Sequence, residues 1–164
     1  MPNEFSFDIT CNFDKQEFQN ALDQARREIA NRFDFKGVLA NIEIQDNNLL
    51  LNTESEHRLN ALIDLVESKL IRRGLPLSIL DKSKPPEQAA SNTLRKQIKL
   101  INNLDADQAK EVTKLIRQGF PKAKPTIQGE TIRVSSRSKD ELQAIMRLLK
   151  NEKNHLPLRF SNFH

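Results

Sequence analysis

The chain has 164 residues, of which 37% are hydrophobic and 29% charged, with a net charge of +4, and this composition excludes fibrous, collagen-like and wholly disordered proteins. No apolar run approaches the roughly 20 residues that span a bilayer, and the N-terminus lacks the basic and apolar segments of a signal peptide. A single cysteine, Cys11, allows neither an internal disulfide nor a multi-cysteine metal site, so we expect a cytoplasmic protein that does not contact a membrane.

In chain order, the hydrophobic pattern predicts a strand, a helix, two strands joined by a turn, a helix and a strand, and then the same order again. Apolar residues that alternate with polar ones, or short apolar runs, predict strands at 5–10, 38–45, 77–80, 94–101, 122–128, 131–135 and 156–161. Capping residues predict helix starts at Asp14–Glu17, Thr53–Glu56, Asp105–Gln108 and Ser138–Glu141. Gly74 and Gly119 are expected to end the second and third helices.

This repeated order predicts an α+β protein made of two tandem ferredoxin-like (βαββαβ) domains. Each domain would have an antiparallel four-stranded sheet with both helices on one face, which leaves the other face open for binding. The predicted domains are residues 1–82 and 94–164. A linker at 83–93 is indicated by Pro85-Pro86 and a polar composition.

Charge is distributed unevenly along the chain. Residues 1–82 contain 10 Lys or Arg against 14 Asp or Glu, whereas residues 83–164 contain 16 against 8. Because clustered cations attract phosphates, this asymmetry indicates an anionic partner for the second half, and a well-solvated surface is the alternative.

Alternation along the two hairpin strands of the second half predicts a basic stripe on the open face. Arg133 is the strongest candidate, since a mid-strand outward arginine can bind phosphate in a bidentate way. Lys99, on the preceding strand, is expected to extend the stripe. The other predicted members are Lys122, Lys124, Gln128 and Arg137. Solubilising edge residues are the alternative interpretation. The outward positions of the central strands carry no aromatic ring, which argues against RNA recognition by base stacking there.

A second candidate segment joins the first helix to the second strand. It interleaves Phe33 and Phe35 with Arg32, Asp34 and Lys36. A ring could stack on a base while the cations contact phosphate, but both rings could instead close the hydrophobic core.

Signals for catalysis are weak. His57, His155 and His164 have no partner at metal-ligand spacing, and the chain contains no phosphate-cradling glycine loop or nucleophile motif. We therefore predict no catalytic residue, no metal site and no cofactor.

Several segments together resemble the bacterial YajQ family in order and spacing over nearly the whole chain. They are Ser6–Ile9, Asn31–Gly37, Thr53–Ser55, Ile127–Glu130, Ile132–Val134, Asp140–Ala144 and Phe160–Phe163. The chain departs from the family pattern at Ser136, Lys139 and His164, and the last replaces a usual arginine with histidine.

The resemblance implies a cytosolic protein with two ferredoxin-like domains that exchange their first strands. The domains would then comprise about 11–101, and about 1–10 with 102–164. It also implies nucleotide binding, with cyclic di-GMP, ATP, GTP and tRNA as ligands attributed to the family. Our hypothesis is a non-enzymatic cyclic di-GMP or purine nucleotide effector. A tRNA or structured-RNA binder is one alternative, and an adaptor read by a transcription regulator is another.

Overall fold

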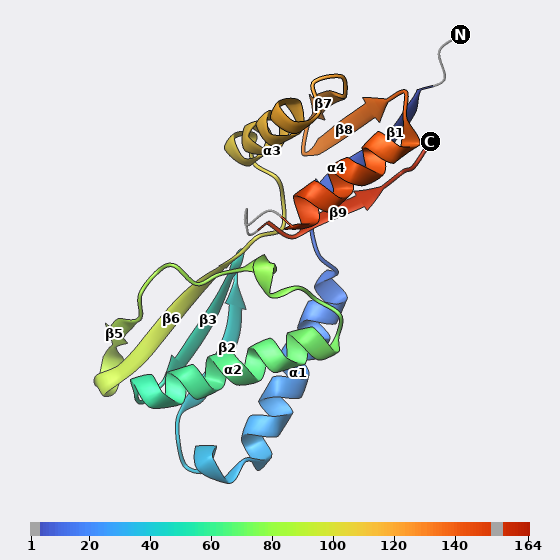
Figure 1. Ribbon diagram of the computed structural model, residues 1–164. Helices are drawn as coiled ribbons and strands as arrows, with labels where there is room; N and C mark the ends of the chain where they lie inside the picture. The colour runs from blue at the N-terminus through green and yellow to red at the C-terminus, as the bar shows by residue number, and fades with distance from the viewer. Residues whose placement is uncertain (1–3, 152–155) are drawn as a thin grey trace. The chain divides into compact units, whose positions relative to one another are not determined.

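The computed structural model describes residues 4–151 and 156–164, and over these the chain is an α+β protein with two antiparallel sheets. The chain divides into two compact units (Figure 1). The central unit is Phe13–Ile101, and the terminal unit combines Met1–Asn12 with Asn102–His164. No helix among the described residues is both long and apolar enough to cross a membrane.

The central unit has a sheet of order β2-β3-β6-β4, with β5 paired to β6. Its elements are α1 (Lys15–Asn31), the 3-10 helix η1 (Phe33–Phe35), β2 (Ala40–Gln45), β3 (Asn48–Thr53), α2 (Glu56–Arg72), η2 (Leu77–Ile79), β4 (Leu80–Asp81), β5 (Glu87–Ala89), η3 (Ala90–Asn92) and β6 (Thr93–Leu100). Helices α1 and α2 lie on one side of this sheet (Figure 1). Apolar residues of both helices, such as Phe18 and Leu62, form one buried cluster with Leu49, Leu51 and Ile98 of the sheet.

The terminal unit has a sheet of order β7-β8-β1-β9. Its elements are β1 (Phe5–Cys11), α3 (Ala106–Gly119), β7 (Lys124–Gln128), β8 (Thr131–Ser136), α4 (Lys139–Asn151) and β9 (Leu158–Ser161). In the register of β1 and β8, Phe7 lies opposite Val134 and Ile9 opposite Ile132, and all four side chains are buried. Asp8 lies opposite Arg133 on the other face of the sheet.

The sheets to which β1 and β6 belong show the strand exchange that the family resemblance implied. β1 is the first strand along the chain, yet it pairs with β8 and β9 of the terminal unit. β6 pairs with β3, β4 and β5 of the central unit. The chain therefore passes between the two ferredoxin-like units twice, after Asn12 and after Ile101.

Several local expectations differ from the structure. The second helix begins with Ser55 as its cap, which accepts from the Arg58 amide, whereas Thr53 ends β3 with its hydroxyl donating to the Leu39 carbonyl. The segment expected as a strand at 77–80 is mostly the 3-10 helix η2. The segment expected as a linker, 83–93, contains β5 and is held by the buried Lys96, whose Nζ donates to the carbonyls of Lys82 and Lys84.

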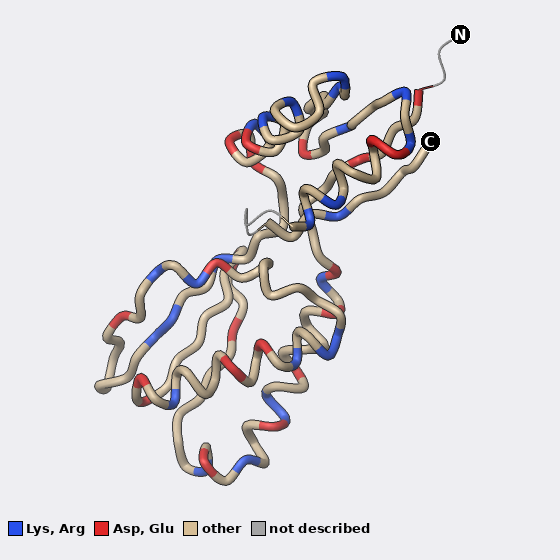
Figure 2. The backbone as a smooth tube through the Cα atoms, viewed as in Figure 1, with Lys and Arg blue, Asp and Glu red and all other residues tan. Residues whose placement is uncertain are grey.

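The two folded units differ less in charge than the two halves of the sequence. The terminal unit contains 12 Lys or Arg against 9 Asp or Glu, and the central unit contains 14 against 13. The asymmetry disappears largely because the basic stretch before residue 101 folds with the acidic central unit. Figure 2 shows Lys and Arg interspersed with Asp and Glu in both units. The charge difference between the two halves of the sequence therefore does not indicate where an anion binds. The local charge at each individual site has to be considered instead.

Candidate functional site

A cleft of about 350 Å³ lies in the terminal unit, between the beginning of β7 and the connection from β8 to α4. It brings together three of the predicted site residues, Lys122, Lys124 and Arg137. The remaining lining residues are Glu4, Ser135, Ser136, Ser138 and Glu141.

The turn after α3 positions the two lysines. Helix α3 ends at Gly119, Pro121 follows, and the Ala123 amide donates to the Phe120 carbonyl at 3.1 Å. Ala123 is buried, so Lys122 and Lys124 on either side of it project into solvent. Lys122 lies in this turn rather than in the strand that the alternation predicted, because β7 begins at Lys124.

Serine hydroxyls organise the start of α4. Ser138 Oγ accepts from the Glu141 amide at 3.2 Å, which is the predicted cap. Ser136 Oγ accepts from the Ser138 amide at 3.1 Å and donates to Glu141 Oε1 at 2.8 Å. The loop is thus fixed by its own hydrogen bonds, and Ser136 is nearly buried.

The cations of the cleft are only weakly neutralised. Lys124 Nζ lies 3.6 Å from Glu4 Oε1, and both side chains are largely exposed, so solvent screens this ion pair. Among the described residues, the side chains of Lys122 and Arg137 form no ion pair and no hydrogen bond. The three cations outnumber Glu4 and Glu141, and they lie at the amino end of a helix, where the backbone dipole also favours anions. This arrangement can hold a phosphate group.

Arg133 does not offer the free cation that its mid-strand position predicted. Its Nε donates to Asp8 Oδ1 at 2.9 Å, and the Asn162 amide donates to Asp8 Oδ2 at 2.8 Å. The hydrogen bond from Arg133, followed by that from Asn162, holds the pKa of Asp8 below its usual value, and the same pairing raises the pKa of Arg133. Because Asp8 is buried, Arg133 neutralises a charge inside the unit. Gln128 is exposed beside the β7–β8 turn and does not line the cleft.

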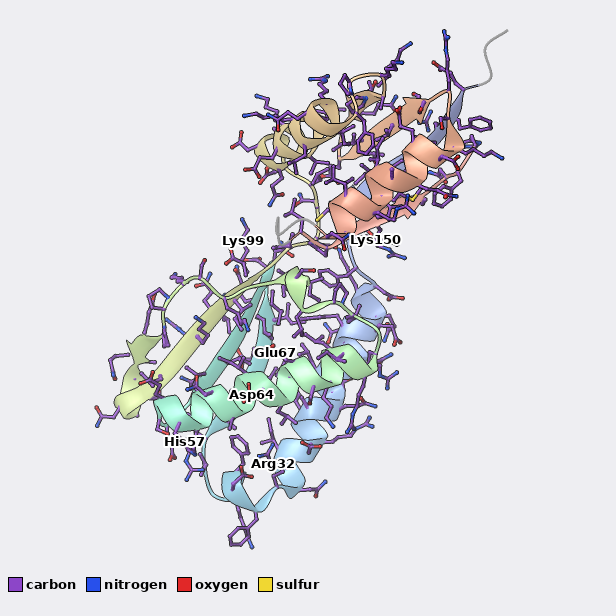
Figure 3. All side chains as sticks on the ribbon, viewed as in Figure 1. Arg32, His57, Asp64, Glu67, Lys99 and Lys150 are labelled. Atoms are coloured by element: carbon purple, nitrogen blue, oxygen red, sulfur yellow. The ribbon has the colours of Figure 1, made fainter. Side chains whose placement is uncertain are left out.

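Lys99 does not extend the basic stripe, because β6 belongs to the central unit (Figure 3). In the sheet register Lys99 lies opposite Asn48 of β3 and Asp81 of β4. Its charge contributes to lowering the pKa of Asp81, after the hydrogen bonds from Ser83. The prediction that Lys99 extends the stripe within the sheet of β7 and β8 was therefore wrong.

The aromatic segment after α1 divides into a core residue and an exposed one. Phe35 is buried, so it cannot stack on a base as predicted, whereas Phe33 is 89% exposed. Arg32 binds Asp34 through two hydrogen bonds of 3.0 and 2.7 Å and lies over the Phe35 ring at 5.3 Å (Figure 3). Lys36 is exposed. Only Phe33 and Lys36 of the four predicted residues are therefore available to a ligand without breaking an internal contact.

Comparison with known proteins identifies the family. Residues 5–164 match the family model described as "Nucleotide-binding protein YajQ-like". The chain belongs to this family. It is 44% identical to a protein from Synechococcus sp. (strain JA-3-3Ab) over 99% of both chains. It is 43% identical to one from Roseiflexus castenholzii, again over 99% of both chains, and each of these relatives is named "Nucleotide-binding protein".

Two features of the cleft in this YajQ-like chain were not predicted from the sequence. The first is the contribution of Ser135, Ser136 and Ser138, although the run of serines around Arg137 was a visible signal. The second is Glu4, which precedes β1 and reaches the cleft only because β1 joins the sheet of the terminal unit.

Proposed function

We propose that this protein binds a nucleotide without chemical turnover, and that the phosphates of the nucleotide bind to Lys122, Lys124 and Arg137. The observation that supports the proposal most directly is the gathering of these three cations around one cleft at the start of α4. The family and the names of the relatives agree with it. A cytosolic location is part of the same proposal.

The geometry of the cleft favours a role in phosphate binding more than in enclosing a whole ligand. Its volume of about 350 Å³ is near the lower end of ordinary small-molecule sites. Its lining residues are charged or hydroxyl-bearing, with no aromatic ring to stack on a base. We therefore infer that a cyclic dinucleotide or purine nucleotide would leave its base outside this cleft.

The proposal of a non-enzymatic role follows from the state of the polar groups. Two of the serines are already engaged in organising the start of α4, and the lining contains neither histidine nor cysteine that could activate a nucleophile. The two carboxylates of the lining are also engaged, since Glu141 accepts from the Ser136 hydroxyl and Glu4 lies 3.6 Å from Lys124. We therefore propose that the site holds an anion without chemical turnover.

Structured RNA such as tRNA is the second candidate ligand. It is favoured by the exposure of Phe33, Lys36 and Lys99 in the central unit, because a long ligand could contact cations and a ring that the cleft does not include. Binding of RNA would be dominated by phosphate contacts and so would depend steeply on salt.

Calorimetric titration of the full chain with cyclic di-GMP, GTP, ATP and tRNA, each at two salt concentrations, tests the proposal. The variant Lys122→Gln/Arg137→Gln removes two cations of the cleft. The variant Lys110→Gln/Arg147→Gln removes the same two kinds of charge from exposed helix positions outside it. We expect the first variant to weaken binding of one of the nucleotides at least tenfold, since hydrogen bonds to charged groups contribute about 1.5–3 kcal/mol each.

The control variant should change the affinity much less. Equal losses in both variants, or no loss in either, would show that the cleft is not the phosphate site. A steep salt dependence with tRNA, together with no measurable nucleotide affinity, would favour the RNA alternative.

A further inference from the structure

The central unit has a second charged site, an open groove of about 620 Å³ between α1 and α2. The charged residues that line it come from both helices and from the end of α2. They are Glu17, Arg27, Glu28, Lys69, Arg72 and Arg73. None of them belongs to the cleft at α4 or to the sites that the sequence analysis predicted.

Both carboxylates of the groove are already matched by a cation. Lys69 Nζ donates to Glu28 Oε1 at 2.8 Å, and Lys69 is almost completely buried. This hydrogen bond is the largest cause that holds the pKa of Glu28 below its usual value. Arg73 Nη1 lies 3.6 Å from Glu17 Oε2. The two acids therefore have little negative charge left for the other cations of the groove.

Two arginines of the groove are left without a partner of their own. Among the described residues, neither Arg27 nor Arg72 forms an ion pair or a hydrogen bond through its side chain. Arg72 feels the charge of Glu28, but only as a lesser contributor after Lys69 and Arg32. The groove thus combines a net charge of +2 with two exposed guanidinium groups.

We propose that the groove between α1 and α2 is a second anion site that binds a compact diphosphate group through Arg27 and Arg72. A guanidinium presents two parallel N–H donors that match the oxygens of a phosphate, so two arginines suit two linked phosphates. The groove has the volume of an ordinary ligand site, and its lining includes no aromatic ring for a base. Recognition therefore rests on the phosphate groups. Inorganic pyrophosphate and the phosphate tail of a nucleoside diphosphate share this chemistry.

The test uses the full chain labelled with ¹⁵N and titrated with inorganic pyrophosphate. Amide resonances of residues 24–31 and 69–73 should shift at saturating pyrophosphate. Calorimetry should show an affinity that falls at least tenfold in Arg27→Gln/Arg72→Gln, since each arginine makes a charged hydrogen bond. The variant Arg27→Lys/Arg72→Lys keeps the charge and loses the forked donors. Its affinity for pyrophosphate should therefore lie between that of the wild type and that of the glutamine variant.

The control variant Arg117→Gln/Arg147→Gln removes two exposed helix arginines of the terminal unit. It should leave the affinity for pyrophosphate within twofold of the wild-type value. The same titration in the Lys122→Gln/Arg137→Gln background separates this groove from the cleft at α4. Shifts of the groove amides should persist there even if nucleotide binding at the cleft is lost or never existed.

Competition identifies the source of the diphosphate. Displacement of pyrophosphate from the groove by ADP and not by AMP would support the tail of a nucleoside diphosphate, and no displacement by either would support inorganic pyrophosphate. The proposal is overturned if the groove amides do not shift, or if the glutamine variant binds pyrophosphate as tightly as the Arg117→Gln/Arg147→Gln control. Both arginines are exposed and unpaired, so the glutamine variant should fold normally, and its circular dichroism spectrum checks this.

Discussion

Phe33 and Phe35 are two residues apart in one short 3-10 helix, and truncating each of them should have very different effects on stability. Phe35 is 4% exposed and belongs to the core cluster of the central unit, whereas Phe33 is 89% exposed. Phe35→Ala removes a buried ring and leaves a cavity. Phe33→Ala removes a ring that water already surrounds.

The magnitude for Phe35 follows from its burial. Truncation of a buried phenylalanine to alanine costs about 3–5 kcal/mol. We expect about 3 kcal/mol for Phe35, because η1 lies at the end of α1 and can partly collapse into the space. For a unit of this size that corresponds to a fall in Tm of about 12 °C or more. Phe33→Ala should change the free energy of unfolding by no more than about 0.5 kcal/mol.

Urea unfolding followed by far-ultraviolet circular dichroism measures both effects, since the chain has neither Trp nor Tyr as a fluorescent probe. The same two proteins are then titrated with nucleotide and tRNA. If Phe33 stacks on a base, Phe33→Ala weakens binding while its unfolding curve stays that of the wild type. Equal destabilisation by the two substitutions would refute the assignment of Phe35 to the core and of Phe33 to the surface.

Two further predictions concern titrating groups of the terminal unit. Burial, with a smaller contribution from Asp105, raises the pKa of the Cys11 thiol to about 11, so Cys11 should react with iodoacetamide far more slowly in the native protein than in urea, and equal rates would contradict this. The pKa of Asp8 is held below its usual value of 3.8, so its contribution to stability is complete above that pH and is lost as the pH falls through the lowered pKa. Asp8→Asn should therefore be less stable near neutral pH and should lose less stability on acidification, as urea midpoints across the acid range would show. An unchanged acid dependence in Asp8→Asn would mean that the pair with Arg133 does not hold this charge.

Helix starts and hairpins were predicted well because their causes are local. Asp14 and Asp105 cap α1 and α3 as expected, and Asp105 forms the complete capping box with Gln108. Gly129 has the positive φ that its hairpin turn requires. The displaced cap of α2 shows the limit, since Thr53 and Ser55 both carry hydroxyls. Ser55 caps the helix, and the Thr53 hydroxyl instead donates to the Leu39 carbonyl.

The candidate site was predicted only in part. Lys122, Lys124 and Arg137 do come together, although the reasoning placed Lys122 on a strand and not in the turn where it lies. The pairing of Arg133 was not foreseen, because its partner Asp8 is 125 positions away along the chain. Strand alternation states which face a side chain occupies, and it contains no information on which strand will lie beside it.

The amino-acid sequence by itself determined the helices, most strands and the ferredoxin-like order, because caps and hydrophobic periods act over a few residues. The hydrophobic pattern does not show that β1 and β6 change places. The family resemblance implied it, and only the tertiary structure shows it, together with which charges neutralise one another. Strand exchange brings Asp8 to Arg133 and Glu4 to the cleft, and it carries Lys99 away to the central unit. Electrostatic interactions depend on distance in space, so a cation counted along the chain becomes a binding group only where folding leaves its charge largely unneutralised.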